Sequence, residues 1–497
     1  MLDSAATRTE TTMPLPIAFR SARDLAALIR RGRTTSVELL GLYFDRLARF
    51  NPKLNAIIVV DRDRARRRAR AADKALARGE IWGPLHGVPM TIKESFDVAG
   101  LPSTWGIPSL KDNIAAKNAV VVDRLLDAGA VLFGKTNVPL LLSDWQSFNA
   151  VYGTTNNPWD VARIPGGSSG GSAAALAAGL TGLDYGSDIG ASIRNPAHYC
   201  GVYGHKPTFD IVPLRGHALP GKLPKMDIAV AGPLARSAAD LELALKLTAG
   251  PDEIEAAGLR LALKPCPRKH LRDFRVAVML DHPTAEVDRA VQDRIAAVAA
   301  FAAKKGARVS DRARPAIDPH EAHRVYVMLL RAETSSSLDE TAFARQLEAA
   351  RTLKPGDEQY YRWLVEANTL YHRDWLAFNE ERHRMRLAWA DFFRAWDVLL
   401  CPTATTAAFP HNQNGERWER MINVNGKPQP TTTQLFWAGF SNMAYLPSTV
   451  APAGLTPTGL PVGVQIVGPQ YGDLTTIGFA KLLESEFGGF VSPTGYD

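Results

Sequence analysis

The chain has 497 residues, of which 46% are hydrophobic and 22% charged, the composition of an ordinary soluble globular protein and not of a disordered one. Its 58 lysines and arginines exceed its 51 aspartates and glutamates only slightly, giving a formal net charge of +7. An excess this mild does not favour nucleic acid as a partner.

The cysteines and the N-terminal stretch carry no signal for export. Cys200, Cys266 and Cys401 are odd in number, widely separated and without CxxC or Cys/His metal spacing, which favours a reducing compartment. The stretch MLDSAATRTETTMPLP lacks a basic region followed by an apolar one, and no apolar run approaches the length of a membrane span. We therefore expect a cytoplasmic protein, a monomer or homodimer, with no metal or other cofactor and no membrane partner.

The predicted elements alternate between helices and strands. Residues 21–49 predict two helices, with an N-cap at Thr34, Thr35 or Ser36, and the arginine-rich residues 61–80 predict one exposed helix. Short apolar segments that predict strands follow, and they alternate with helical stretches: LNAIIVV, GVPMTIK, AVLFGK, VAVML and VQIVG. Residues 259–396 are strongly helical in propensity and are expected to form a helical insertion or cap. The pattern predicts an α/β fold with a mixed sheet wrapped by helices.

Glycine and serine concentrate in residues 165–196, PGGSSGGSAAALAAGLTGLDYGSDIGASIRNP. Glycines leave backbone N–H groups open to a ligand, and serines present hydroxyls beside them. Such a loop suits an anion, either a bound phosphate or the oxyanion of acyl transfer. Neither GK[ST] nor GxGxxG occurs in this segment, so acyl transfer is the better interpretation.

Two arrangements of an acyl-transfer site remain open at this point. Residues 166–170 and 167–171 both satisfy GxSxG, which would make Ser168 or Ser169 the nucleophile of an α/β-hydrolase elbow. An elbow follows a buried strand, whereas DVARIP precedes these glycines, so this alternative is disfavoured. Downstream histidines such as His411 keep it open.

The second arrangement rests on a set of ordered motifs. The segments GVPMTIKESFDVAGLPSTWG, GGSSGGSAAALAAG and GSDIGASIRNPA resemble the lysine, serine-glycine and nucleophile segments of the amidase signature family. AGPLARSAADLELAL, CPTATTAAFP and GLPVGVQIVG match further family segments in the expected order. The resemblance runs through most of the chain. It implies one domain over residues 1–497, with a large mixed, twisted β-sheet surrounded by α-helices and a variable substrate-side region at residues 259–396.

The resemblance also implies the catalytic residues. Ser192 would be the nucleophile, Ser168 the bridging serine behind a cis peptide bond, and Lys93 the base. Lys93 and Ser168 are 75 residues apart (168 − 93), and Ser168 and Ser192 are 24 apart (192 − 168). A lysine removes a proton only while it is neutral, and burial at the end of the strand VPMTIK would lower its pKa. No carboxylate should then pair with the amine, so Glu94 is expected to point elsewhere.

Further roles follow from the same resemblance. The oxyanion would bind the backbone N–H groups of Ile189, Gly190, Ala191 and Ser192. Ala191 stands where the family commonly has glycine. Side chains that support the nucleophile loop would be Ser169, Asp188 and Arg194. Side chains that wall the substrate pocket would be Leu140, Leu141, Trp145, Phe436 and Trp437.

These walls suit a small, uncharged alkyl or aryl substrate. The resemblance implies hydrolysis of linear amides through an acyl-enzyme, with esters and carbamates (urethanes) accessible to the same chemistry, and water and a small amide or carbamate as the only partners. A different class of function stays open: the A-type component of a tRNA-dependent amidotransferase, which acts only within a complex.

Overall fold

The computed structural model describes residues 15–223 and 225–497. Its larger sheet has eight strands in the order β10-β9-β11-β15-β14-β7-β8-β6. Along the chain these are β6 (Asp184–Asp188), β7 (Tyr203–Lys206), β8 (Val230–Ala235), β9 (Arg275–Val278), β10 (Arg308–Ser310), β11 (Val398–Pro402), β14 (Ser448–Leu455) and β15 (Pro461–Val467). β9 is parallel to β10 and β11, and the remaining pairs are antiparallel. The predicted mixed sheet is confirmed.

A smaller sheet has the order β1-β3-β2. Its strands are β1 (Ile57–Val60), β2 (Pro89–Lys93) and β3 (Val131–Thr136). Backbone hydrogen bonds join its edge strand β2 to the chain just before β6: the Thr91 N–H donates to the Leu183 carbonyl at 3.2 Å, and the Gly182 N–H donates to the Pro89 carbonyl at 3.2 Å. We call this junction the seam. It places the last residue of β2, Lys93, beside the larger sheet.

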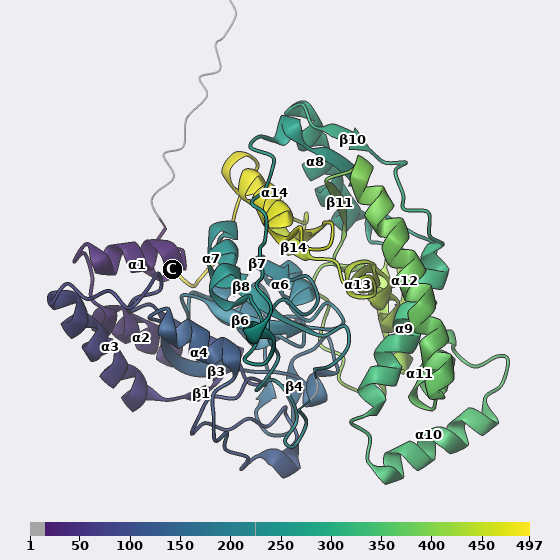
Figure 1. Cartoon of the computed structure of the whole chain (residues 1–497), viewed down its shortest axis with the longest axis horizontal. Coiled ribbons are helices and arrows are strands. Elements are labelled where there is room, and N and C mark those ends of the chain that lie inside the picture. Colours follow the sequence, from purple (N-terminus) through teal and green to yellow (C-terminus); the bar gives the residue numbers. More distant parts are fainter. Residues whose placement is uncertain (1–14, 224) are drawn as a thin grey trace, which may run out of the picture.

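Helices cover both sheets (Figure 1). They are α1 (Ala22–Arg30), α2 (Ser36–Leu54), α3 (Arg62–Ala77), α4 (Val120–Asp127), α5 (Gly170–Ala177), α6 (Arg194–Cys200), α7 (Ala238–Thr248), α8 (Arg289–Lys304), α9 (Pro319–Ser335), α10 (Glu340–Thr352), α11 (Gln359–Asn368), α12 (His372–Ala395), α13 (Leu435–Asn442) and α14 (Asp473–Glu486). The remaining strands form two antiparallel hairpins. One pairs β4 (Phe148–Asn149) with β5 (Gly153–Thr154), and the other pairs β12 (Met421–Val424) with β13 (Lys427–Pro430). α5 and α6 are buried along their whole length, since they follow the two glycine-rich loops into the interior.

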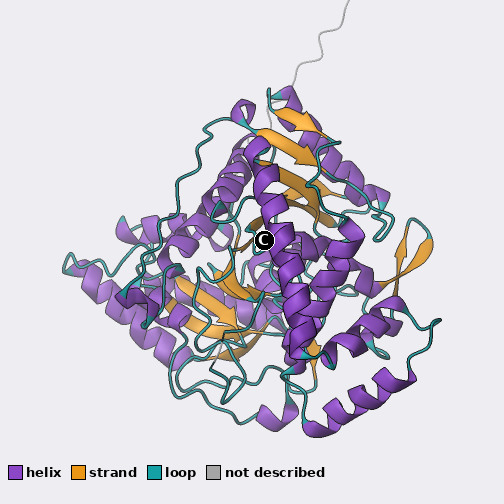
Figure 2. Cartoon of the chain, turned by 45° about the vertical axis from the view of Figure 1, so that its right-hand side comes forward, coloured by secondary structure: helices purple, strands orange, loops and turns teal. Residues whose placement is uncertain are grey.

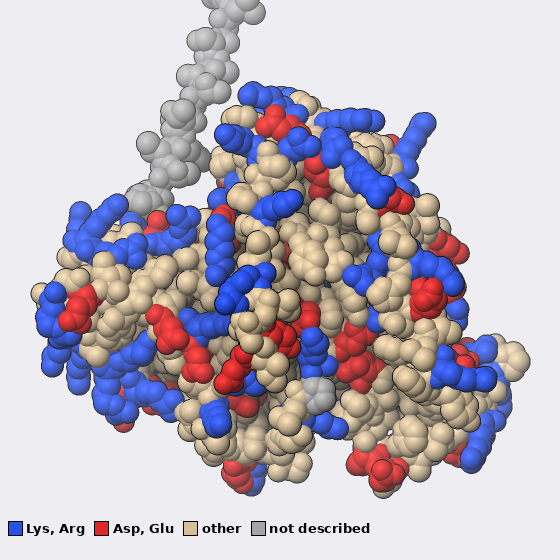
Figure 3. Space-filling view, in the orientation of Figure 1, with Lys and Arg blue, Asp and Glu red and all other residues tan. Residues whose placement is uncertain are grey.

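The N-terminal helices form as their sequence predicts. Thr35 caps α2 with a reciprocal capping box to Glu38. The arginine-rich segment forms α3, which buries the alanine stripe Ala65, Ala69, Ala72 and Ala75 and exposes arginines to solvent. Figure 3 shows these basic side chains spread over the α1–α3 end of the molecule with acidic ones among them. No helix of the described residues is long and apolar enough to cross a membrane.

The region 259–396 is more than a helical cap. It supplies α8 to α12, but it also supplies β9 and β10, which are strands of the main sheet. α9 packs against α11 and against α12, and the three helices form a layer that lies on the right of Figure 1 and comes to the front in Figure 2. This layer faces α13, so it belongs to the same core as the sheet.

Candidate active site

Lys93 lies at the end of β2 with its side chain fully buried. Its Nζ donates to Ser168 Oγ at 2.6 Å and to Ser187 Oγ at 2.9 Å. Burial lowers the pKa of Lys93 to about 7, against the opposing charges of Asp188 and Asp184. The amine is therefore available as a neutral base near neutral pH. Ser187, a second hydroxyl on the amine, was not predicted, because it carries no signal apart from its place in the nucleophile segment.

Glu94 points away from the amine, as expected. Its carboxylate accepts the backbone N–H groups of Thr104 at 2.5 Å and Trp105 at 3.0 Å. Among the described residues, no carboxylate forms an ion pair with Lys93.

Ser168 follows a cis peptide bond with Gly167, as the family resemblance implies. A side chain at position 167 would collide with the backbone of Asp144, so the position requires glycine. The Ser168 hydroxyl is held by Lys93, and the next residue, Ser169, donates its N–H to the Ser192 carbonyl at 3.0 Å. The two glycine-rich loops are thus joined directly through their backbones.

Ser192 lies in the loop between β6 and α6, with its side chain 5% exposed. Within the described residues its hydroxyl makes no hydrogen bond, so the Lys93–Ser168 half of the predicted relay is formed and the Ser168–Ser192 half is not. A hydroxyl without an internal partner is open to a substrate carbonyl. Catalytic hydrogen bonds are often long in unliganded enzymes and tighten when the substrate binds.

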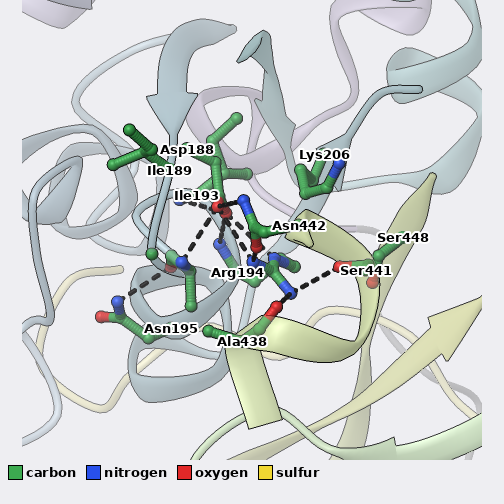
Figure 4. Close-up of polar contacts among 12 residues, drawn as sticks. Asp188, Ile189, Ile193, Arg194, Asn195, Lys206, Ala438, Ser441, Asn442 and Ser448 are labelled. Atoms are coloured by element: carbon green, nitrogen blue, oxygen red, sulfur yellow. Dashed lines mark hydrogen bonds and ion pairs between the residues drawn. The ribbon is translucent and has the colours of Figure 1, made fainter. Parts of the chain in front are cut away.

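Asp188 and Arg194 hold the nucleophile loop from inside (Figure 4). Both side chains are fully buried, and Arg194 Nε and Nη2 each lie 3.0 Å from an oxygen of Asp188. The carboxylate also accepts the N–H groups of Ala191 at 2.9 Å and Ile193 at 3.1 Å. Although burial alone would raise it, the charge and hydrogen bonds of Arg194 lower the pKa of Asp188 to about 2. The pair therefore stays ionised and supports the loop, as expected.

The role expected of Ala191 needs correction. Its N–H donates to Asp188 Oδ1 and so is not available to an oxyanion in this structure. Ala191 also has a left-handed backbone with φ of 69°, which explains why glycine suits this position. The candidate oxyanion donors that remain are the N–H groups of Ile189, Gly190 and Ser192.

Two aromatic side chains fix the carbonyl groups of this loop. Tyr326 Oη, from α9, donates to the Ile189 carbonyl at 2.8 Å, and Trp145 Nε1 donates to the Gly190 carbonyl at 2.8 Å. Since the C=O and N–H of a trans peptide point in opposite directions, each bond also fixes the direction of the following N–H. Tyr326 was missed from the sequence, because a single tyrosine within a helix carries no motif.

The predicted pocket walls divide into two groups. Leu140 is 48% exposed, and Leu141 and Trp145 are partly buried, so this loop reaches solvent. Phe436 and Trp437 are 1% and 0% exposed, and the Trp437 indole donates to the Ala285 carbonyl at 3.1 Å inside the core. These two aromatics lie in the protein interior, and their place in the wall of the substrate pocket stays a prediction. Leu435, at the start of the same helix, lies beside Gly190 instead.

The nucleophile-elbow alternative lacks its structural context. No described strand directly precedes the Ser168–Ser169 loop. The imidazole nitrogens of His411 make no hydrogen bond to any described residue, so this histidine does not serve as the base of either serine. Ser169 instead precedes α5 as its N-terminal flanking residue.

A phosphate-loop pattern outside the serine-glycine segment also fails. Residues 129–136, GAVLFGKT, satisfy GxxxxGK[ST], but the segment folds mainly as strand β3 rather than as a loop before a helix. Lys135 is buried and donates to the Pro102 carbonyl, and Thr136 shares a hydrogen bond with Ser172 at 2.9 Å. No phosphate cradle results.

Comparison with known proteins agrees with this geometry. Residues 38–477 match the family described as Amidase. The chain belongs to the amidase family. As an amidase it is a hydrolase of amides, and it has the fold class of the amidase signature enzymes.

Three relatives show the range of the family. An indoleacetamide hydrolase of Bradyrhizobium diazoefficiens is 33% identical over 485 residues, covering 95% of this amidase and 87% of the relative. The A-type component of the glutamyl-tRNA(Gln) amidotransferase of Anaeromyxobacter dehalogenans is 32% identical, covering 95% and 97%. The solved structure of a bacterial aryl acylamidase of the amidase signature family superposes with a TM-score of 0.80 at 25% identity, covering 95% of this amidase and 97% of that chain.

Proposed function

We propose that this amidase cleaves the C–N bond of small, uncharged linear amides with alkyl or aryl groups, through an acyl-enzyme on Ser192. The observation that carries the proposal is the buried amine of Lys93, held 2.6 Å from Ser168 Oγ without a carboxylate partner among the described residues. A neutral lysine is a base, and the intervening serine can pass a proton in either direction.

In the proposed reaction Ser192 Oγ attacks the amide carbonyl as its proton passes to Ser168 and the Ser168 proton passes to Lys93. The negative oxygen of the tetrahedral intermediate binds the N–H groups of Ile189, Gly190 and Ser192. The same path then returns a proton to the departing amine, and water releases the acid from Ser192. Because Ser168 gains and loses one proton in each step, it ends each step unchanged.

Esters and carbamates enter the same scheme. A carbamate differs from an amide only in the group on the acyl carbon, so Ser192 would attack it in the same way. The similarity to an indoleacetamide hydrolase and to an aryl acylamidase supports aryl-containing substrates. We further propose that the enzyme acts in the cytoplasm as a monomer or homodimer without a cofactor; its three cysteines are free thiols.

A matched pair of substrates tests the proposal: a nitroanilide and a nitrophenyl carbamate of related size, incubated with the wild type and with Ser192→Ala, Ser168→Ala and Lys93→Ala. We expect each substitution to lower kcat/KM on the order of 10⁴-fold or more. The ratio of the two wild-type rates decides between amidase and urethanase. Full activity of Ser192→Ala would exclude Ser192 as the nucleophile.

The second candidate, the A-type component of an amidotransferase, is favoured by the similarity to the Anaeromyxobacter protein. It predicts that the lone chain releases ammonia from glutamine only when its partner proteins are added. Hydrolysis of the nitroanilide by the purified chain, without stimulation by such partners, would argue against it.

A further inference from the structure

Asp184 is a buried carboxylic acid near the catalytic lysine that the proposed relay does not use. It is the first residue of β6, and its side chain is fully buried. Thr91 Oγ1 donates to Oδ2 at 2.6 Å, whereas Oδ1 has no hydrogen-bond partner among the described residues. Leaving a carboxyl oxygen buried without a partner costs free energy, so this arrangement calls for a physical reason.

The seam brings Asp184 to the face of β2 from which the lysine projects. Thr91 and Lys93 are alternate residues of β2, so their side chains leave the strand on the same face. The hydrogen bond from Thr91 places Asp184 on that face, one side chain behind Lys93. The backbone bond from Thr91 to Leu183 fixes this register.

The other charged groups near Lys93 are already balanced. Asp188, the second acid of β6, forms a buried ion pair with Arg194. Burial and the charge of Lys93 lower the pKa of His217 to about 3, so this imidazole is neutral at working pH. Asp184 has no cation other than Lys93 among the groups that shift its pKa.

The neighbours of Asp184 are otherwise uncharged. Hydroxyls of Thr91 from β2 and Ser172 from α5 face the carboxyl, and Tyr185 follows it in β6. Burial raises the pKa of Asp184 to about 7, against the hydrogen bond from Thr91, the nearby hydroxyl of Ser172 and the charge of Lys93. The carboxyl and the amine therefore titrate in the same range of pH, as a coupled pair.

We propose that Asp184 is a positioning residue that acts through Lys93, as the buried counter-charge that sets the pH at which the lysine becomes a free base. The inference rests on the proposed function, in which Lys93 accepts the proton of the attacking serine. When that proton arrives, the ammonium group forms near a carboxylate, and the pair has no net charge. Because an isolated buried charge is far more costly than a neutral pair, the carboxylate strengthens the base.

Asp184→Asn tests the counter-charge, since asparagine keeps the size of the side chain and can still accept the Thr91 hydroxyl. Without the negative charge Lys93 holds its proton less tightly. We expect the acid limb of the pH profile of kcat/KM to move to lower pH by roughly one unit. We also expect the plateau rate to fall several-fold, because the base is weaker. A merely structural role would lower the rate without moving the limb.

Two further variants keep the test independent of folding. Thr91→Val keeps the carboxyl of Asp184 but removes the hydroxyl that donates to it, so Asp184 binds its proton more tightly. We therefore expect the acid limb of the pH profile to move to lower pH, by less than in Asp184→Asn. Asp240→Asn is the matched control: Asp240 is also buried but accepts the N–H groups of Ala22 and Arg23. It should lose stability and keep the wild-type limb.

The outcomes separate this inference from the proposed function. An unchanged acid limb in both Asp184→Asn and Thr91→Val would overturn the role of Asp184 while leaving the relay intact. Hydrolysis that survives in Lys93→Ala would overturn the relay itself. If the acid limb moves in both Asp184→Asn and Thr91→Val but stays in place in Asp240→Asn, Asp184 is established as the counter-charge.

Discussion

The indole N–H of Trp145 donates to the carbonyl oxygen of Gly190 at 2.8 Å, which ties the loop after β3 to the nucleophile loop. The bond fixes the peptide that joins Gly190 to Ala191, directly before Ser192. A residue predicted from the sequence only as a pocket wall thus also controls the shape of the loop that carries the nucleophile.

Trp145→Phe should reduce activity more than stability. Phenylalanine keeps an aromatic ring but leaves the Gly190 carbonyl without its donor, and a lost hydrogen bond costs about 1 kcal/mol. We expect kcat to fall roughly 10-fold, because the loop loses its fixed geometry. Trp159→Phe removes a similar bond, to the Cys200 carbonyl at 2.9 Å, outside the loop. Equal losses of kcat in the two variants would contradict a specific role for Trp145.

Tyr326→Phe tests the second anchor of this loop. The substitution removes only the hydroxyl that donates to the Ile189 carbonyl, and the ring continues to fill its buried site. We expect kcat to fall about 10-fold with little change in KM, since the Gly190 N–H would lose its fixed direction toward the oxyanion. The comparison is Tyr199→Phe, whose hydroxyl bonds to Gln434 at 2.9 Å. A change confined to KM would show that Tyr326 binds substrate instead.

Ala191→Gly should stabilise the fold modestly. The left-handed φ of 69° destabilises the folded state by about 1–2 kcal/mol when the residue is alanine, and glycine avoids this strain. Part of the stabilisation is lost, because glycine also makes the unfolded chain more flexible. We expect the free energy of unfolding to rise by about 0.5–1 kcal/mol in denaturant titrations. Ala197→Gly, within α6, should change it in the opposite direction. A destabilised Ala191→Gly would mean that its methyl group contributes more by packing than the backbone loses by strain.

Lys93→Met should abolish activity and stabilise the protein near neutral pH. The pKa of Lys93 is lowered in the folded state from 10.5 to about 7, so the unfolded chain binds the proton more tightly. The lysine therefore opposes folding most strongly at pH 7 and below, and the effect fades as pH rises toward 10.5. We expect the variant to gain a few kcal/mol at about pH 7 and progressively less at higher pH. Thermal unfolding measured from about pH 7 to about pH 10 checks this slope; a gain that does not change with pH would refute it.

The sequence was sufficient for the parts of the site that motifs encode. Lys93 and Ser168 are far apart in the chain, yet the resemblance of their segments to the amidase signature family implies the contact seen at 2.6 Å. The contribution of α9 could not be found in this way. Tyr326 reaches the loop from 137 residues away, and its role depends on tertiary packing that periodicity does not record.

The errors have the same physical origin. The family resemblance places Phe436 and Trp437 in the pocket wall, but it does not predict that they lie on the short helix α13 with almost no exposure to solvent. Residues 259–396 are helical on average, and that average hides the short strand β10, whereas the apolar segment VAVML predicts β9. Ala191 was expected to donate to the substrate, because the competing carboxylate of Asp188 is recognised only in three dimensions.

The two halves of the catalytic machinery belong to different sheets. Lys93 ends an edge strand of the smaller sheet, whereas Ser192 follows an edge strand of the larger one. A proton can cross between them only while those edges stay in register, since hydrogen-bond distances tolerate shifts of a few tenths of an ångström. The catalytic rate therefore depends on the alignment of the two sheets. We expect mild heating or low concentrations of denaturant to abolish activity before either sheet unfolds.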